Sequence, residues 1–477
     1  MSRRVVTVVC LGFIASVSAQ AQAPEQSLMW PAWRGPLGTG EAIAGDPPVE
    51  WSETTNVRWK TPIPGMGAST PIIWGETIYL QTATPVGDDK SPRQTDFAFP
   101  EQRDVYHGLA YFRATRDYEF AMVAVDRQSG RLLWRKVLRV EQPSEGRHPT
   151  NTFASASPST DGQRIIAFFG SRGLYGLDMR GEVIWERDFG EMTTRNGWGE
   201  GSSPTLFRNR VVVTWDHEGD SFIATLDAST GRELWRRPRN EPTTWATPLV
   251  VPVGDRVQVI TNGQQHVRGY DLESGAEIWH GPGLTFNSIP SPVHVDGIAY
   301  LTSGFQGNVL LAVDLSRARG DIERSGALLW RRDRDTPYVA SPLLYRGSLY
   351  VFKHLQGLMT AIDARTGAVL YGPVRIPEIP DLYASPVAAA GRVYVAGRDG
   401  RTVVFRHGPA FSVVAVNELD DGFDASPAVV GNEIYLRGRK ALYCIARPGD
   451  AAAWRMFRQL GPIASVGERE PTGGGSN

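Results

Sequence analysis

The sequence predicts an all-β fold, an eight-bladed β-propeller built of four-stranded antiparallel blades. Two observations predict it. A unit that opens with Ser-Pro or Thr-Pro recurs eight times, and six units also carry an Asp, a turn with Gly, and an aromatic residue four positions after that Gly. A period of about 40–50 residues with several short apolar strands is typical of propeller blades. Seven blades is the alternative, should one degenerate unit form no sheet.

The opening prolines set the period of the repeat. They are Pro71, Pro158, Pro204, Pro248, Pro292, Pro342, Pro386 and Pro427. From Pro158 onward the spacings are 46, 44, 44, 50, 44 and 41 residues, whereas the first interval is 87. The long first interval predicts an insertion over about residues 85–120. Because proline lacks an N–H, it fits the start of a strand, where no ladder donor is needed.

The second half of the unit predicts how blades pack. It stands as Asp126-Gly130-Trp134, Asp178-Gly181-Trp185, Asp227-Gly231-Trp235, Asp271-Gly275-Trp279, Asp314 with Gly326 and Trp330, and Asp363-Gly367-Tyr371. The Asp side chain can accept hydrogen bonds from the turn, Gly accepts a positive φ, and Trp is placed to fill the gap between neighbouring sheets. The units after Pro386 and Pro427 have lost this half.

Ring closure explains a strand that no unit precedes. Residues 56–60 (Asn-Val-Arg-Trp-Lys) resemble a fourth strand, and the final unit, residues 427–446, supplies about three strands. Pairing the two would close the ring and remove an open edge.

The chain divides into four segments. Residues 1–23 read as a secretory signal, with Arg3 and Arg4 before a short apolar stretch and two Ala-x-Ala cleavage sites. Residues 24–50 are an N-terminal extended segment, 51–449 the propeller, and 450–477 a tail expected to be mostly disordered. The signal predicts a periplasmic or secreted protein, because the apolar stretch is too short to span a membrane.

Charge and cysteine content exclude several classes of function. Without Arg3 and Arg4 the chain has 48 basic and 51 acidic side chains, so it lacks the basic excess that nucleic-acid binding needs. No later apolar run reaches membrane-spanning length. Cys444 is the one cysteine left after cleavage, so we expect no intrachain disulfide and a buried structural thiol. A monomer is expected.

The repeat resembles that of the pyrroloquinoline-quinone (PQQ) propellers, which include quinoprotein alcohol dehydrogenases and the outer-membrane assembly propeller of the BamB type. The resemblance covers roughly residues 30–449. Marks of a group known as PQQ-like propeller repeat proteins stand at residues 33–36 (Trp-Arg-Gly-Pro), 56–60, 148–151, 161–162 with 169–171, and 199–204.

The resemblance implies two different functions. The dehydrogenases hold PQQ and Ca²⁺ on the propeller axis against a disulfide of adjacent cysteines, which this chain cannot form. The candidate calcium ligands are loop carboxylates spread over several blades, namely Glu200, Asp216, Glu218, Asp335 and Asp399. No metal site and no catalytic residue can be assigned, and we find no hydrolase, zincin or phosphate-loop motif.

The family's arrangement predicts which loops share one face. Loops before the first strands contribute His148, Asn151, Trp198, Glu200, Trp245, Phe286, Tyr338 and Tyr383. Loops between second and third strands contribute Arg172, Asp216, His217, Glu218, Gln264, Gln265, Gln306, His354, Gln356 and Asp399. Aromatic and amide side chains around a funnel suit a polar planar ligand or a peptide. The alternative is that these residues pack and cap tight loops, or, for Asp216 to Glu218, form a solvated loop.

These observations favour an extracytoplasmic binding propeller or scaffold for an envelope protein partner or a small polar ligand. The aromatic insertion is expected to fold over one face and to add to the binding surface. The alternatives are a PQQ-dependent alcohol or sugar dehydrogenase with a minimal axial site, and a metal-dependent enzyme that acts on sugars or polyols. No cofactor is assigned; PQQ with calcium belongs to the first alternative.

Overall fold

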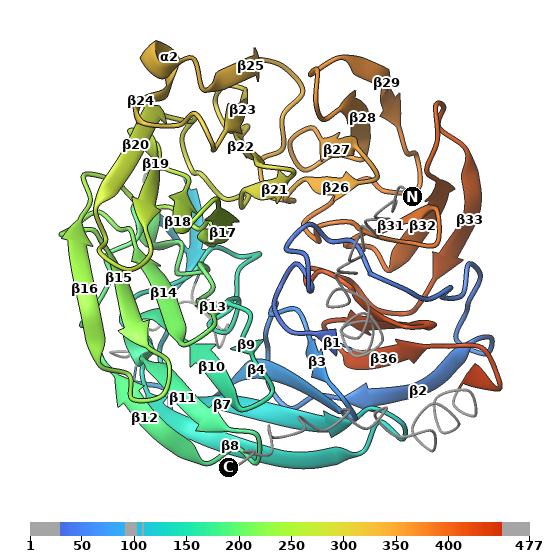
Figure 1. The fold of residues 1–477 in the computed structure, drawn as a ribbon. Helices are drawn as coiled ribbons and strands as arrows, with labels where there is room; N and C mark the ends of the chain where they lie inside the picture. The colour runs from blue at the N-terminus through green and yellow to red at the C-terminus, as the bar shows by residue number, and fades with distance from the viewer. Residues whose placement is uncertain (1–28, 91–102, 107–108, 451–477) are drawn as a thin grey trace, which may run out of the picture.

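The computed structural model describes residues 29–90, 103–106 and 109–450. Eight antiparallel sheets stand around one axis as propeller blades, each with its first strand innermost (Figure 1). The fold predicted from the repeat is therefore confirmed, with eight blades. The predicted signal and the tail beyond Asp450 lie outside the described residues.

The first four blades follow in chain order. Blade 1 consists of β3 (Ile72–Trp74), β4 (Thr77–Val86), β7 (Asp117–Asp126) and β8 (Leu132–Glu141). Blade 2 consists of β9 (Ser159–Thr160), β10 (Arg164–Phe168), β11 (Leu174–Asp178) and β12 (Val183–Arg187). Blade 3 consists of β13 (Thr205–Phe207), β14 (Arg210–Trp215), β15 (Phe222–Asp227) and β16 (Glu233–Pro238). Blade 4 consists of β17 (Leu249–Val253), β18 (Arg256–Thr261), β19 (His266–Asp271) and β20 (Glu277–Pro282), with β24 (Gly320–Asp321) added parallel to β20.

The remaining blades complete the circle. Blade 5 consists of β21 (Val293–Val295), β22 (Ile298–Ser303), β23 (Val309–Asp314) and β25 (Leu328–Arg332). Blade 6 consists of β26 (Leu343–Tyr345), β27 (Ser348–Phe352), β28 (Leu358–Asp363) and β29 (Val369–Arg375). Blade 7 consists of β30 (Val387–Ala389), β31 (Arg392–Ala396), β32 (Arg401–Arg406) and β33 (Val413–Glu418). Blade 8 consists of β34 (Ala428–Val430), β35 (Glu433–Arg437), β36 (Ala441–Ile445) and β2 (Val57–Pro62). The short helices are η1 (Gly170–Arg172), η2 (Arg195–Gly197) and α2 (Ile322–Ser325).

The hydrophobic core lies between blades. Middle strands such as β27 and β36 are buried at every residue, because both faces of each sheet pack against a neighbouring blade. Outer strands expose most of their residues, as in β12, where only Trp185 is buried. Cys444 in β36 is fully buried, and burial raises the pKa of its thiol to about 12, which leaves it unreactive at neutral pH.

In blades 2, 3 and 5 the aromatic residue that ends the pattern joins one blade to the next, whereas Trp279 of blade 4 donates to Gln258 of its own blade. Trp185 of blade 2 donates its indole N–H to the carbonyl of Ala228 in blade 3, at 2.9 Å. Its ring covers Gly231, where an added Cβ would come within 2.5 Å of the indole and where φ is +66°. Glycine is therefore required by the close approach and by the backbone. The same indole-to-carbonyl bond recurs for Trp235 and Trp330.

The contact that closes the ring is again an indole N–H that donates to a carbonyl of the next blade. Strand β2 pairs antiparallel with β36, and Trp59 donates to the carbonyl of Arg127 in blade 1 at 3.0 Å. Glu433 in β35 accepts from Arg127 at 2.8 Å and also binds Arg58 of β2. Although burial opposes it, these two arginines hold the pKa of the Glu433 carboxyl below its ordinary value. One carboxylate thus ties both ends of the propeller together.

A relay of hydroxyl groups runs around the axis. The Ser or Thr before each opening proline donates its backbone N–H to the hydroxyl of the equivalent residue in the next blade. The bonds measure 2.7–3.1 Å and link Thr70, Ser157, Ser203, Thr247, Ser291, Ser341, Ser385 and Ser426 in that order. The relay is open between blades 8 and 1, where the hydroxyl of Thr70 has no partner in the described part of the chain.

The N-terminal segment crosses the inner ends of the blades (blue in Figure 1). Strand β1 (Met29–Trp30) adds to the inside of β3 in blade 1. Further along, the segment is bonded by its backbone to blades 2, 6 and 7. Trp33 donates its indole N–H to the hydroxyl of Ser426, 3.2 Å away, at the open end of the relay. The buried Arg34 donates to the carbonyls of Thr39 and Pro342.

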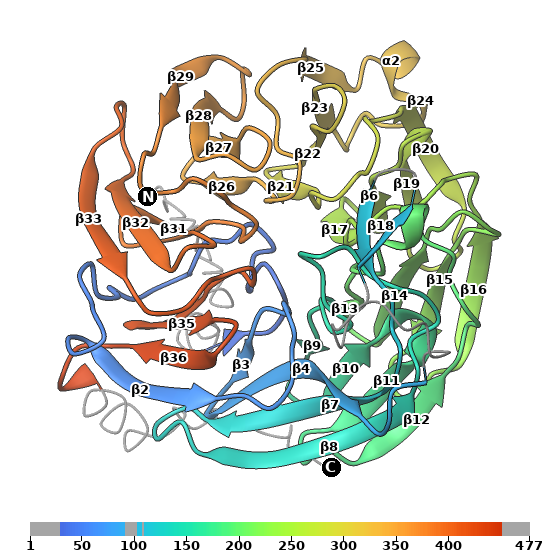
Figure 2. The same cartoon turned by 180° about the vertical axis from the view of Figure 1, so that it is seen from behind.

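The insertion of blade 1 folds back over one face of the ring. Its hairpin pairs β5 (Arg103–Tyr106) with β6 (Leu109–Phe112) and reaches η2 between blades 2 and 3 (Figure 2). Phe112 and Arg147 exchange both backbone hydrogen bonds, and the Arg147 guanidinium lies 4.8 Å from the Phe112 ring centroid. The hairpin therefore lies beside the loops that precede the first strands of blades 2 and 3.

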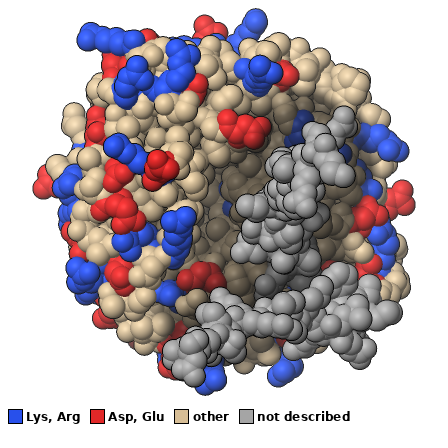
Figure 3. Space-filling model, in the orientation of Figure 1, with Lys and Arg blue, Asp and Glu red and all other residues tan. Residues whose placement is uncertain are grey.

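The surface carries mixed charge. Basic and acidic side chains are interspersed over the visible rim of the face shown in Figure 3. Within the described ranges, no helix has the length and apolar character needed to cross a membrane.

The relay predicts a contrast between two threonines in equivalent positions. Thr247→Val removes the acceptor of the Ser203 N–H and should lower the free energy of unfolding by about 1–3 kcal/mol. Thr70→Val removes a buried hydroxyl without a partner and should change the free energy of unfolding by less than about 0.5 kcal/mol. Chemical denaturation of both variants checks this, and equal destabilisation would contradict the relay.

Candidate functional site

Loops that precede the first strands converge on the axis and enclose a cavity of about 400 Å³, named here the axial cavity. All eight blades contribute a loop residue or the hydroxyl at the opening proline. The lining residues are Trp33, Ala68, His148, Thr150, Asn151, Ser155, Ser157, Trp198, Gly201, Ser203, Trp245, Ile289, Phe305, Tyr338, Val339, Leu355, Tyr383, Asp424 and Ser426. The surface of the cavity is mainly apolar, with six Trp, Phe and Tyr side chains and several hydroxyl groups.

Trp33 separates the axial cavity from a second cavity. The second cavity, about 420 Å³, is lined by residues 31–38 and by the first strands of blades 2–5. Trp33 lines both cavities. The N-terminal segment therefore forms one wall of the axial cavity.

The aromatic rings of the axial cavity hold one another in place. Phe305 stacks on Tyr338 with ring centroids 4.6 Å apart, and His148 meets Trp198 edge to face at 5.3 Å. Trp245 donates its indole N–H to the carbonyl of Gly199 at 2.7 Å. The indole N–H of Trp198 is buried and has no partner among the described residues.

His148 is held neutral. Burial, reinforced by Arg398 and Arg147, lowers the pKa of its imidazole. Its Nδ1 contacts the hydroxyl of Thr150 at 2.7 Å, and that hydroxyl lies 3.2 Å from the hydroxyl of Tyr383. Within the described residues, no carboxylate orients this imidazole.

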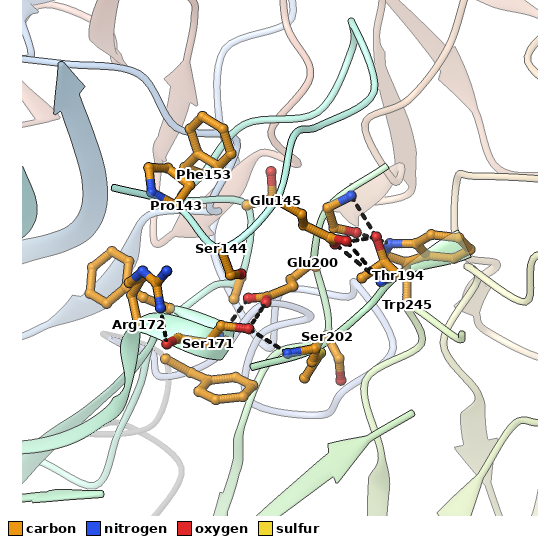
Figure 4. Close-up of a pocket in the computed structure, with 18 of the residues that line it drawn as sticks. Pro143, Ser144, Glu145, Phe153, Ser171, Arg172, Thr194, Glu200, Ser202 and Trp245 are labelled. Carbon is orange, nitrogen blue, oxygen red and sulfur yellow. Dashed lines mark hydrogen bonds between the residues drawn. The ribbon is translucent and has the colours of Figure 1, made fainter. Parts of the chain in front are cut away.

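Beside the axial cavity lies a smaller one of about 50 Å³, named here the carboxylate cavity, with two glutamates in its wall (Figure 4). Glu200 accepts from the backbone N–H of Ser171 at 2.9 Å and from its hydroxyl. Glu145 likewise accepts from the backbone N–H and the hydroxyl of Thr194. Burial, assisted by the nearby Glu145, raises the pKa of Glu200 to about 7 against the hydrogen bonds from Ser171.

The cluster Asp216-His217-Glu218 is dispersed over three contacts. Asp216 forms a bidentate, fully buried ion pair with Arg239 at 2.7 and 3.0 Å. His217 accepts from the backbone N–H of Thr193 at 3.1 Å. Glu218 accepts from Thr243 and pairs with Arg195 at 3.3 Å. None of these three residues lines the axial cavity.

The other candidates predicted from the sequence divide by location. Those that line the axial cavity are His148, Asn151, Trp198, Trp245, Tyr338 and Tyr383. Those that line the carboxylate cavity are Arg172, Glu200, Asp216 and Trp245. Gln264 accepts from Arg195, Gln265 donates its N–H to Glu241, Asp399 pairs with Arg401, and the His354 ring lies 6.4 Å from that of Tyr338.

Sequence reasoning missed several lining residues. The sequence identifies Trp33 only as part of a motif of the PQQ-like group, because it precedes the first repeat unit and no repeat position predicts its role. Phe305 lies next to Gln306 in a loop between second and third strands. The criterion that selected Gln306 as a candidate therefore also applies to Phe305. The hydroxyls of Ser157, Ser203 and Ser426 were read only as part of the strand-opening motif.

The residues present do not fit a calcium-bound quinone. Calcium takes roughly six to eight oxygen ligands. The one acidic side chain of the axial cavity, Asp424, is engaged by Arg398 and Arg439. Over the described ranges, no three His, Cys, Asp or Glu side chains are grouped closely enough to hold a metal ion.

Comparison with known proteins identifies relatives of two kinds. Residues 45–201 and 321–456 match the family described as outer membrane protein assembly factor BamB. The BamB of Shewanella oneidensis strain MR-1 is 23% identical over 296 residues, which cover 59% of this chain and 66% of that protein. A lanthanide-dependent methanol dehydrogenase of Methylorubrum extorquens strain AM1 is 36% identical over 72 residues, 14% of this chain and 12% of the enzyme. The matches thus span less than two thirds of either relative.

Solved structures share the fold. A europium-containing methanol dehydrogenase superposes with a TM-score of 0.59 at 11% identity, over 87% of this chain and 90% of that one. At this identity the likeness concerns architecture alone.

The raised pKa of Glu200 predicts a pH-dependent stability. Because the folded state holds this proton more tightly than the unfolded state, the contribution is complete below the ordinary pKa of 4.5 and is lost as the pH rises through about 7. The melting temperature of Glu200→Gln, relative to the unmodified protein, should therefore rise between about pH 5 and about pH 8. Glu191→Gln, an exposed neighbour that pairs with Arg172, is the control. A constant difference would show that Glu200 has no raised pKa.

Proposed function

The chain belongs to the family described as outer membrane protein assembly factor BamB, and from this premise we propose that it is an extracytoplasmic binding propeller whose axial cavity holds an aromatic or other flat group of a client molecule. The predicted secretory signal supports the location. The name of the family supports a client in envelope assembly, and the axial cavity supports the binding role.

The observation that carries the proposal is the aromatic lining of the axial cavity. Ligand sites measure about 300–1,000 Å³ and combine apolar walls with a few polar groups. The axial cavity has about 400 Å³ and presents indole, phenol and phenyl rings from several blades. Aromatic side chains in enclosed pockets contribute most of the free energy of binding at interfaces.

The polar groups of the axial cavity support binding better than catalysis. A nucleophile needs an adjacent base that a third group orients. Here Nδ1 of His148 is used by Thr150, two residues later, and Asp424 is paired with two arginines. Both arrangements hold loops in place. Because the relay fixes the loops that carry the rings, little conformational entropy should be lost on binding.

An indole ligand tests the axial cavity. N-acetyl-L-tryptophan should bind the full chain, and Tyr338→Leu should weaken binding about tenfold by removing one stacked wall. Phe286→Leu is the matched control, since Phe286 is 46% exposed and lines neither the axial nor the carboxylate cavity. Isothermal titration calorimetry gives both dissociation constants. Equal affinities for the two variants would place the ligand elsewhere.

Thermal unfolding with PQQ distinguishes the binding module from the quinoprotein alternative. If the protein is a binding module, PQQ should raise the melting temperature no more with Ca²⁺ than without it. A ligand at 100 times its dissociation constant would add about 2.7 kcal/mol to the stability of the folded state. A clear calcium-dependent rise would contradict the binding-module proposal and favour the dehydrogenase.

A further inference from the structure

A further cavity, named here the basic cavity, adjoins the axial cavity. It measures about 310 Å³ and lies among residues 63–68, 149–152 and 437–441, together with Arg398 and residues 424–425. It shares Ala68, Thr150, Asn151 and Asp424 with the axial cavity. One ligand could therefore occupy both cavities.

Four cationic side chains line this basic cavity, and three are paired. Arg398 contacts Asp381 at 2.7 Å and Asp424 at 2.6 Å. Arg439 contacts the same Asp424 at 2.9 Å. Lys440 pairs with the exposed Asp420 at 2.7 Å. These three cations are thus largely neutralised.

Arg437 is the exception. It is 3% exposed, and its hydrogen bonds within the described residues go to the carbonyl and hydroxyl of Ser69, with no ion pair. Burial without a carboxylate lowers the pKa of its guanidinium to about 9. An enclosed charge without a counter-ion is costly, so a bound anion would be strongly stabilised there.

The backbone leaves room for this guanidinium. An added Cβ at Gly67 would come within 2.3 Å of Nη2 of Arg437 and 2.9 Å of its Cζ. Gly67 and Arg437 both line the basic cavity. Glycine at position 67 therefore lets the cation lie at the cavity wall.

Arg398 connects the two cavities. Its guanidinium lies 4.2 Å from the ring centroid of Tyr383, which lines the axial cavity, while Arg398 itself lines the basic cavity. An aromatic group in the axial cavity would thus have cationic donors within reach of a short substituent.

We propose that Arg437 and the basic cavity form an anion subsite for a carboxylate carried by the aromatic ligand of the axial cavity. This inference rests on the proposed function and narrows the ligand to an aromatic group with a carboxylate a few bonds away. A free aromatic acid and a polypeptide that ends in an aromatic residue share this chemistry.

A matched pair of probes tests the subsite on the full chain. N-acetyl-L-tryptophan and N-acetyl-L-tryptophanamide have the same indole, but only the first has a carboxylate. The acid should bind at least about tenfold more tightly, as expected for a charge-assisted hydrogen bond. Arg437→Gln should abolish this preference while leaving the affinity for the amide unchanged, which also shows that the variant is folded.

Arg401→Gln is the control variant, because Arg401 pairs with Asp399 and Glu418 and lines neither cavity. It should keep the preference for the acid. A short peptide that ends in tryptophan, with a free or an amidated C-terminus, distinguishes the two sources. Tighter binding of the free peptide than of the acid supports a chain end, and equal binding supports a small aromatic acid.

The outcomes separate the two proposals. Equal affinities of the acid and the amide for the unmodified protein would overturn the anion subsite and leave the axial site standing. Failure of both probes to bind would overturn both. The comparison on the unmodified protein holds even if Arg437→Gln does not fold.

Discussion

The structure depends on the relay of Ser and Thr hydroxyls around the axis. Each first strand would otherwise leave a backbone N–H without a partner where the blades converge, and burying an unsatisfied donor is costly. The hydroxyl of the next blade accepts it instead, so that the six opening residues from Ser157 to Ser385 act as donor and acceptor at once. This explains why the motif is Ser-Pro or Thr-Pro. It also fixes the loops just before it, which carry the rings of the axial cavity.

The relay has one open link, and the N-terminal segment lies there. Between blades 8 and 1 the circle is closed by β2, by Trp59 and by the carboxylate of Glu433 between two arginines. The last hydroxyl of the relay, Ser426, accepts from Trp33 in addition to Ser385. The segment at the open end of the relay therefore also supplies an aromatic wall of the axial cavity, through Trp33.

The fold could be predicted because its contacts repeat. The opening Ser-Pro or Thr-Pro recurs in all eight units, and in six units an aromatic residue follows a turn Gly at a spacing of four, so the repeated pattern specifies the ring. The site does not repeat. Trp198 and Tyr338 could be found because they precede first strands, whereas Trp33 lies before the first unit and no period points to it. Asp216 appeared available, but its partner Arg239 is 23 residues away in another loop, and sequence spacing carries no information on such a pairing.

The central claim is that the aromatic axial cavity, extended by Arg437, is a preformed ligand site. A crystal structure of the full chain with N-acetyl-L-tryptophan tests it most directly. The account predicts the indole between Trp33, Trp245 and Tyr338 and the carboxylate at Arg437, with the surrounding loops unmoved. An axial cavity that holds only water at saturating ligand, or a ligand bound on another surface, would contradict it.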